Sequence, residues 1–379
     1  MTDKEHYPSS THPPLPPTPE DEQFARLRLL RSRRVGIATY KRLLIEHGTA
    51  QNALAALPEV ARAAGVSDYT ICPEAVVQAE LRNGRAAGAR LVAFGDHNYP
   101  ATLSEIDDAP PFLWVLGDCA LLARPMVSLV GARNASSLGT RMAKSLARDL
   151  GDAGYVVVSG LARGIDAAAH NAALPTGTIA VQAGGVDVMY PAENTDLAHA
   201  IAKSGLRLSE QPMGLQPFAR HFPSRNRIIS GLARATVVVE AAAKSGSLIT
   251  ARDALDQGRD VLAVPGHPFD ARASGCNMLL RDGATLIRSA ADVLEVLGTP
   301  SQPELPLAPA AAPVKKRSLQ DHAALHSQIL ARLGPSPIAE DQLIRDLRAP
   351  AAAVAPVLVD LELDGQIARQ AGGLLCKVD

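Results

Sequence analysis

The pattern of hydrophobic and polar positions predicts a central α/β domain. Six short apolar runs recur between residues 126 and 297, separated by stretches with helical periodicity. Such runs are typical of strands that are buried on both faces. They are Met126–Val130, Tyr155–Ser159, Thr178–Gln182, Leu206–Ser209, Thr236–Glu240 and Asp260–Val264. Their alternation with helices predicts a Rossmann-like parallel sheet covered by helices on both faces.

The region before this domain has a helical pattern. Phe24, Leu27 and Leu30 follow each other at helical spacing, and the pattern is interrupted by glycine at Gly36. Similar stretches continue until about residue 87. We therefore expect a small helical domain over residues 21–87.

The remaining boundaries follow from composition. Two extended segments, Arg90–Phe94 and Phe112–Leu116, are expected to lead into the main sheet, so the α/β domain is assigned to residues 88–297. Residues 1–20 are rich in proline and poor in apolar side chains, which predicts a disordered tail. Residues 298–320 are rich in proline and alanine, which predicts a linker.

Residues 321–379 predict a winged-helix domain, because three helical patterns precede two short strands. The segments are His322–Leu333, Ile338–Leu347, Ala351–Asp364, Ile367–Gln370 and Leu374–Lys377. The third helix contains Asp360, Glu362 and Asp364 but no lysine or arginine, so it is a poor partner for DNA phosphates. We expect this domain to contact protein rather than to act as a sequence-specific transcription regulator.

Composition limits the classes of function. Hydrophobic residues make up 47% of the chain and charged residues 20%, which is ordinary for a globular protein. The formal net charge is −1, so any nucleic-acid site must be a local cluster of cations. The four cysteines, Cys72, Cys119, Cys276 and Cys376, form no C-x-x-C pair, and we expect reduced thiols rather than a metal site or disulfides. Without a signal-like N-terminus or a long apolar run, we expect a cytoplasmic protein with no membrane partner.

Two predicted strands end in glycine-rich turns that suit an anion. Gly131 and Arg133 follow the first strand, and Gly160 and Arg163 follow the second. Glycine lets backbone N–H groups approach a phosphate, and the next helix adds its positive end. An ordinary strand-to-helix turn explains the first segment equally well, because it does not match the dinucleotide or P-loop fingerprints.

The second turn continues into a predicted helix. Asp166 is placed to cap that helix, which runs through His170. A lone histidine in this position more often orders a loop than takes part in catalysis.

The segment around Phe222 has an unusual concentration of arginine. It contains Arg220, Phe222, Arg225, Asn226 and Arg227, in a chain whose aromatic content is only 3%. Arginine matches phosphate oxygens in a bidentate manner, and an aromatic ring stacks on an unpaired base, which suits single strands. The alternative is a buried ion-pair cluster with acidic partners, and different arginines can serve the two roles.

A third strand end adds Lys244, Ser245 and Gly246 before another helix, which again suits phosphate. No H-E-x-x-H, G-x-S-x-G or paired-carboxylate motif is present. We therefore expect no catalytic residues, no metal and no cofactor.

The motifs between Met126 and Arg288 resemble, in their order, those of the DNA-processing protein A family, also called Smf. They are Gly131-Ala132-Arg133, Ser159–Asp166 with His170, Gly184-Gly185, Tyr190-Pro191, Ser209-Glu210, Phe222–Ile229, Glu240 with Ser245-Gly246-Ser247, and Pro265-Gly266. The helical N-terminal region resembles the family's sterile-alpha-motif-like (SAM-like) domain, and the C-terminal region is similar to its winged helix. Ala132 departs from the family's usual serine.

This resemblance implies a dimer that binds single-stranded DNA, protects it and loads the recombinase RecA during natural transformation. It further implies that Arg133, Arg225 and Arg227 face phosphates, that Gly131, Gly160 and Gly246 supply backbone donors, and that Phe222 stacks a base. The alternative is a phosphoribohydrolase-like nucleotide enzyme of related fold. Pro265-Gly266-His267-Pro268 lacks the second glycine and the glutamate of that group's motif.

Overall fold

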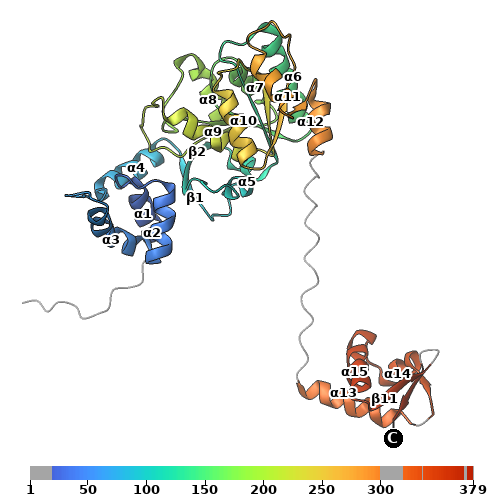
Figure 1. The fold of residues 1–379 in the computed structure, drawn as a ribbon. Coiled ribbons are helices and arrows are strands. Elements are labelled where there is room, and N and C mark those ends of the chain that lie inside the picture. The colour runs from blue at the N-terminus through green and yellow to red at the C-terminus, as the bar shows by residue number, and fades with distance from the viewer. Residues whose placement is uncertain (1–18, 299–318, 335, 371–373, 379) are drawn as a thin grey trace, which may run out of the picture. The chain divides into compact units, whose positions relative to one another are not determined.

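The computed structural model describes residues 19–298, 319–334, 336–370 and 374–378. The chain forms two compact units, Met1–Pro300 and Ser301–Asp379 (Figure 1). The tail expected at residues 1–20 and the linker expected at 298–320 lie almost entirely outside the described residues.

The first unit is built on a nine-stranded sheet with the order β1-β2-β6-β5-β4-β3-β7-β8-β9. The strands are β1 (Arg90–Ala93), β2 (Phe112–Gly117), β3 (Met126–Gly131), β4 (Val156–Ser159), β5 (Thr178–Val181), β6 (Leu206–Ser209), β7 (Ala235–Glu240), β8 (Asp260–Ala263) and β9 (Thr285–Leu286). All pairs from β6 across to β9 are parallel. The expected Rossmann-like sheet is thereby confirmed, but β2 pairs antiparallel with β6 and with β1, so the complete sheet is mixed.

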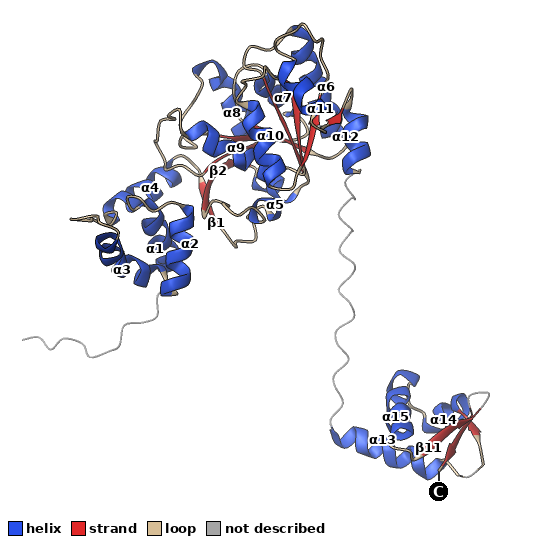
Figure 2. Cartoon of the chain, in the orientation of Figure 1, coloured by secondary structure: helices blue, strands red, loops and turns tan. Residues whose placement is uncertain are grey.

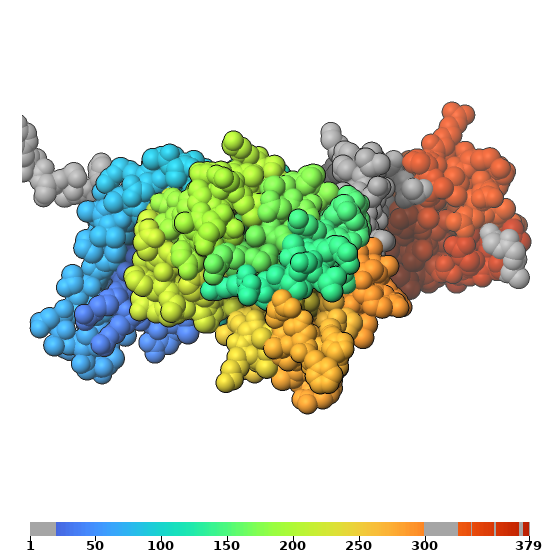
Figure 3. Space-filling model, turned by 90° about the horizontal axis from the view of Figure 1, so that it is seen from above, coloured from blue at the N-terminus to red at the C-terminus, as the bar shows by residue number. Residues whose placement is uncertain are grey.

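Helices cover both faces of this sheet (Figure 2). The helices of this domain are α5 (Ala101–Ser104), α6 (Ser137–Asp152), α7 (Ile165–Ala173), α8 (Thr195–Ser204), α9 (His221–Leu232), α10 (Ser247–Asp256), α11 (Ser274–Arg281) and α12 (Ala290–Leu297), with short 3₁₀ turns at Cys119–Ala123 and Ala192–Asn194. Side chains alternate along β3, so Val127 and Leu129 pack with α6, α7 and α12, whereas Met126 and Val130 pack with α5, α9, α10 and α11. In Figure 3 the green segment with α6 and α7 lies beside the orange segment with α12.

The N-terminal region is helical, as expected. Its helices are α1 (Pro19–Arg31), α2 (Ile37–His47), α3 (Ala50–Ala63) and α4 (Glu74–Ala86). It belongs to the same compact unit as the sheet, and a buried carboxylate joins the two parts. Glu80 of α4 accepts two hydrogen bonds from Arg31, at 2.8 and 2.9 Å, and one from the Trp114 indole of β2, at 2.7 Å. A Cβ at Gly84 would lie 2.2 Å from the Trp114 ring, so only glycine permits this approach.

His170 is a core residue. It is completely buried, and its Nδ1 lies 2.7 Å from the Thr178 hydroxyl of β5. Burial, assisted by the positive charge of Arg225, lowers the pKa of His170 to about 3. The imidazole is therefore neutral at neutral pH and links α7 to the sheet.

In its described residues, the second unit contains three helices and a three-stranded sheet of order β10-β12-β11. Its elements are α13 (Leu319–Arg332), β10 (Ile338–Ala339), α14 (Glu340–Leu347), α15 (Ala351–Leu363), β11 (Ile367–Gln370) and β12 (Leu374–Lys377). The winged-helix prediction is confirmed. One detail is wrong: Ile338 and Ala339 do not begin the helix, because they are extended and pair with β12.

The Glu80 contact leads to a stability prediction. We expect Glu80→Ala to lower the free energy of unfolding by about 3 kcal/mol, because removing one partner leaves the charge of Arg31 and the Trp114 indole unpaired at a buried site. Chemical denaturation measures this change. Glu74→Ala is the matched control, since Glu74 pairs with Arg28 but its side chain is 59% exposed, and we expect a loss below about 1 kcal/mol. Equal losses in the two variants would contradict the prediction.

A second prediction concerns pH. The unfolded chain protonates His170 near its ordinary pKa of 6.5, whereas the folded protein does not until about 3. Protons therefore favour unfolding in this window, and stability falls as pH is lowered. Between about pH 6.5 and pH 5 this residue should cost about 1.5 kcal/mol. We expect His170→Gln to show a correspondingly weaker pH dependence in denaturant titrations, and an identical dependence would refute the assignment.

Candidate functional site

The strand order of the sheet reverses direction between β3 and β7. The chain proceeds from β3 to β4 and β5 on one side, and from β7 to β8 and β9 on the other. The helix that follows β3, α6, packs on one face, and the helix that follows β7, α10, packs on the opposite face. The two connecting loops therefore diverge and leave a crevice at the carboxyl ends of the strands, which is the usual ligand position in such sheets.

Hydrogen bonds fix the two loops of this crevice against each other. The Ser247 hydroxyl donates to the Gly131 carbonyl at 2.8 Å. The Ala132 N–H donates to the Glu240 carbonyl at 2.6 Å, and the Glu240 carboxylate accepts from the Ser136 N–H at 2.9 Å. These hydrogen bonds join the loops after β3 and β7 at the bottom of the crevice and so fix its shape.

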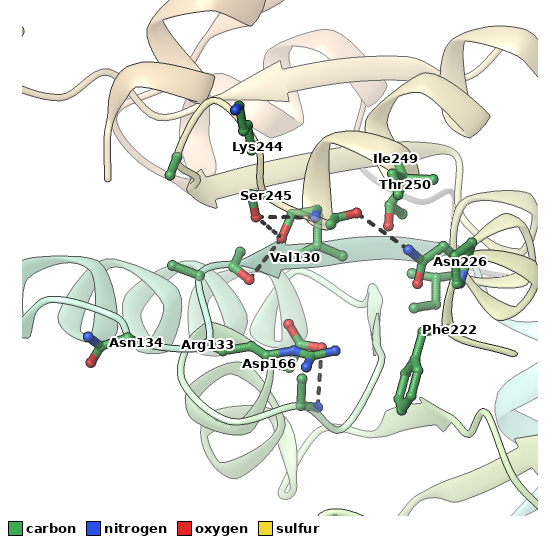
Figure 4. A pocket seen from close by; sticks show the side chains of 18 of the residues that line it. Val130, Arg133, Asn134, Asp166, Phe222, Asn226, Lys244, Ser245, Ile249 and Thr250 are labelled. Carbon is green, nitrogen blue, oxygen red and sulfur yellow. Dashed lines mark hydrogen bonds between the residues drawn. The ribbon is translucent and has the colours of Figure 1, made fainter. Parts of the chain in front are cut away.

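A pocket of about 630 Å³ occupies this crevice. In Figure 4, Lys244 and Ser245 come from the loop after β7 at the top of the view, whereas Arg133 and Asn134 come from the loop after β3 below them. Helix α9 adds Phe222. The predicted site residues that line this pocket are Gly131, Arg133, Phe222, Arg225, Asn226, Lys244, Ser245 and Gly246.

A second pocket of about 380 Å³ adjoins the first, because Arg133, Ala162, Phe222 and Arg225 line both. Gly160 and Arg163 of the loop after β4 also line it. All the predicted site residues except Arg220 and Arg227 therefore line at least one of the two pockets.

Phe222 lies at the boundary between the two pockets. The Arg133 guanidinium lies over its ring, 5.4 Å from the centroid. The Tyr190 ring is tilted against it, with centroids 5.6 Å apart. Arg133 is exposed and Phe222 partly exposed, so a cation and two aromatic rings adjoin in a cleft that solvent reaches.

Arg225 differs from the expectation that it faces phosphate. Its residue is only 6% exposed, and its Nη1 donates to the carbonyls of Gly160, at 2.7 Å, and Val181. A Cβ at Gly160 would lie 2.6 Å from this guanidinium. Burial lowers the pKa of Arg225 to about 10, which still leaves it charged at neutral pH. Arg225 is thus buried, as in the alternative interpretation, but its hydrogen-bond partners are backbone carbonyls at the ends of β4 and β5 rather than carboxylates.

Asp166 was expected to cap its helix, and this expectation is wrong. It stands inside the first turn of α7, where Gly164 is the N-cap residue. Its carboxylate instead accepts from the Gly160 N–H at 3.1 Å and the Ala162 N–H at 3.3 Å. Burial raises the pKa of Asp166, and the charge of Arg225 opposes this effect. Asp166 therefore binds N–H groups of the loop after β4, and Arg225 binds a carbonyl group of the same loop.

Arg227 also has protein partners. Its guanidinium pairs with Asp108 at 2.8 Å and with Glu210 at 2.7 Å, and its side chain is only 12% exposed. This arrangement again supports the ion-pair alternative. Arg220 is exposed at the start of α9, with its guanidinium 5.7 Å from the Phe218 ring.

The backbone donors expected at the glycine-rich turns are partly occupied. The Gly160 N–H donates to Asp166, and the first turn of α6 is capped by Ser136, which accepts from the Gly139 N–H at 2.9 Å. A Cβ at Gly131 would lie 2.6 Å from Ile165. Gly131 and Gly160 therefore permit close packing, while the exposed cations Arg133, Arg163 and Lys244 remain toward solvent.

Several lining residues were not predicted as site residues. Tyr190, Gln182 and Arg272 line the pockets. Tyr190 was noted only as part of a motif, and Arg272 stands far along the chain, so nothing but the fold brings them to the site. Over the described residues there is no cluster of three or more His, Cys, Asp or Glu side chains placed to hold a metal ion. Within the same residues, every helix is too short or too polar to cross a membrane.

Family models match all three parts of the chain. The model described as DNA recombination-mediator protein A matches residues 90–298. A DprA-like N-terminal HHH domain matches residues 20–83, and a DprA winged helix domain matches residues 309–373.

Individual relatives and solved structures agree with these matches. The chain is 48% identical over 201 residues to the DNA processing protein DprA of Streptococcus pneumoniae, covering 52% of this chain and 71% of the relative. It is 38% identical over 288 residues to protein Smf of Escherichia coli, covering 75% and 76%. The X-ray structure of the pneumococcal protein matches with a TM-score of 0.62 and 37% identity over 72% of this chain and 97% of that chain.

A second solved structure is that of DNA processing protein A from Helicobacter pylori, described by its single-stranded DNA binding mode. It matches with a TM-score of 0.51 and 30% identity over 56% of this chain and 97% of that chain. Because the central family model covers more than half of the residues and the flanking models match in order, the chain belongs to the DNA processing protein A (DprA/Smf) family.

Proposed function

We propose that this protein binds single-stranded DNA in the two adjoining pockets, without chemical turnover. The observation that carries the proposal is the contact of Arg133 with Phe222 at the boundary of the pockets, beside Tyr190. A single strand presents phosphates and unstacked bases together, and a cation adjoining aromatic rings matches both. A duplex keeps its bases stacked and would leave the rings unused.

The charge distribution supports binding to a phosphate backbone. The exposed cations Arg133 and Lys244 lie on opposite loops of the larger pocket, and Arg163 lines the smaller one. Arg163 lies 3.4 Å from Glu193, but both side chains are about 60% exposed, so this pair is weak. With a formal net charge of −1, the molecule as a whole has no charge that attracts DNA, so the attraction must come from local cations such as these.

We further propose that the protein protects the bound strand and loads RecA on it during natural transformation, acting in the cytoplasm as a homodimer. Membership of the family supports these roles. For the dimer there is also a structural argument: the sheet ends at the two-residue strand β9, where Leu286 is 48% exposed, and Met278 of the preceding helix α11 is 36% exposed. A sheet edge with apolar side chains suits a second copy of the chain.

Arg133→Ala tests the phosphate contact. We expect single-strand affinity to fall roughly tenfold and the slope of log K against log salt to become shallower by about 0.7, because one phosphate contact is lost. Fluorescence anisotropy with labelled single-stranded and duplex oligonucleotides measures both quantities. Arg148→Ala is the control, because Arg148 is an exposed arginine on α6 that lines neither pocket. An affinity that does not depend on salt, or wild-type protein that binds neither form of DNA, would refute the proposal.

Arg225 offers a separate test of its positioning role. Arg225→Lys keeps the charge but replaces the planar, rigid guanidinium with a single ammonium on a flexible stem, which does not hold the Gly160 and Val181 carbonyls in the same geometry. We therefore expect a roughly tenfold loss of single-strand affinity with an unchanged salt slope, as the loop after β4 shifts. If Arg225 held a phosphate, lysine would largely restore binding. Thermal unfolding of the variant, compared with wild type, separates a shifted loop from a failure to fold.

A further inference from the structure

The loop between β8 and α11 contains the most exposed large apolar side chain among the described residues. Phe269 is 95% exposed, and the His267 ring lies beside it with centroids 5.5 Å apart. Exposure of nearly a whole phenyl ring to water is unfavourable, and the neighbouring His267 ring covers little of it. The ring is therefore available to a partner.

This loop is held in place by hydrogen bonds. Gly266 and Asn277 bond reciprocally, at 3.2 and 3.0 Å. The Phe269 N–H donates to His267 Nδ1, and the Asp270 N–H donates to the His267 carbonyl at 2.9 Å. A hydrogen-bonded turn thus holds Phe269 in its exposed position. Because the backbone of this turn is already ordered, little conformational entropy is lost when the ring binds a partner.

The first turn of α11, which directly follows this loop, is fixed beside the larger pocket. The Ser274 hydroxyl accepts from the Ala243 N–H at 3.0 Å, next to Lys244. The Gly275 N–H donates to the Ala241 carbonyl at 2.8 Å, and a Cβ at Gly275 would clash with that carbonyl at the same distance. The loop after β8 and the Lys244 loop therefore form one rigid rim.

Arg272 connects Phe269 to the pocket itself. It lines the larger pocket and lies 3.5 Å from Glu240, the carboxylate that fixes the loop after β3. Phe269 is three residues away, so their Cα atoms are within roughly 10 Å. Arg272 also forms a two-point contact with Asp270, at 3.1 Å for each bond, which neutralises the one acidic side chain next to the ring.

We propose that Phe269 is a second stacking platform for single-stranded DNA, which receives a base of the strand where it leaves the larger pocket across Arg272. This inference rests on the proposed function and adds to it a path for the bound strand. The strand would run from Phe222 past the loop that carries Lys244 to the loop after β8. Because the Arg272–Asp270 pair contributes little net charge, Phe269 acts through stacking and not through phosphate attraction. Its effect is confined to strands long enough to reach it.

Phe269→Trp gives a direct readout. The chain has one tryptophan, Trp114, which is buried and bonded to Glu80, so its emission stays constant as a background. We expect the introduced indole to be quenched when a base stacks on it, with an oligothymidine of about sixteen nucleotides but not with one of about four. Ile45→Trp is the control, since Ile45 is 84% exposed on α2 in the helical region, and we expect no quenching there.

Phe269→Ala gives the energetic readout. We expect affinity for the longer strand to fall roughly five- to tenfold, affinity for the shorter strand to stay unchanged, and the salt slope to stay that of wild type. If Phe269→Ala bound the longer strand as tightly as wild type, the stacking role of Phe269 would be wrong. The same conclusion would follow if the indole of Phe269→Trp stayed unquenched in a saturated complex. A changed oligomeric state of Phe269→Ala in size-exclusion chromatography would also overturn this role, by assigning the ring to a protein interface.

The two proposals fail in different ways. If wild type binds single strands and Arg133→Ala weakens them while Phe269→Ala does not, only the platform is wrong. If wild type binds no single strand of either length, the proposed function itself is wrong.

Discussion

The reversal of strand order between β3 and β7 is the constraint on which the site depends. The chains that leave these neighbouring strands turn to opposite faces of the sheet, because α6 packs on one face and α10 on the other. No side chain of the core can fill the space between two loops that diverge in this way. The pocket is thus a consequence of topology, and it is lined by the residues that follow β3, β4 and β7 together with the start of α9.

Arginine has two distinct uses around this crevice. Arg225 and Arg227 are buried or nearly so, and they bond to carbonyl oxygens or carboxylates that fix loops. Arg133 and Arg163 are exposed and lie at the pocket walls. A buried guanidinium must keep its partners because an unpaired charge in the interior is costly, whereas an exposed one can exchange water for a ligand oxygen. The buried arginines therefore fix the shape of the pocket, and the exposed arginines make its walls positively charged.

Rigidity extends beyond the pocket. Glu80 and Trp114 join the N-terminal helices to the antiparallel edge of the sheet. Ser274 and Gly275 join the first turn of α11 to the loop after β7. In each case a buried polar group or a glycine allows two backbones to approach closely. The loops that surround the site are consequently presented on a fixed frame, so a ligand would not have to order them on binding.

Much of this protein is determined by its sequence. The apolar runs of four or five residues predicted the parallel strands, because side chains buried on both faces leave a continuous signal. The helical periods predicted the flanking regions. Segments whose elements are very short were missed or misassigned: β9 has two residues, and Ile338–Ala339 joined a helical pattern. Two residues carry no periodicity, so only their pairing with a neighbouring strand defines them.

The sequence also placed Arg133, Phe222 and Lys244 at strand or helix ends, since glycine and cations there have few structural uses. It could not separate Arg225 from Arg133. Both are arginines in motifs, and the difference lies in whether a neighbouring segment covers the guanidinium, as Gly160 and Val181 cover Arg225. Local sequence thus determined which elements form and which chemistry reaches the sheet edge. The tertiary structure decided which charges are buried and which face solvent, because burial depends on contacts between segments far apart in the chain.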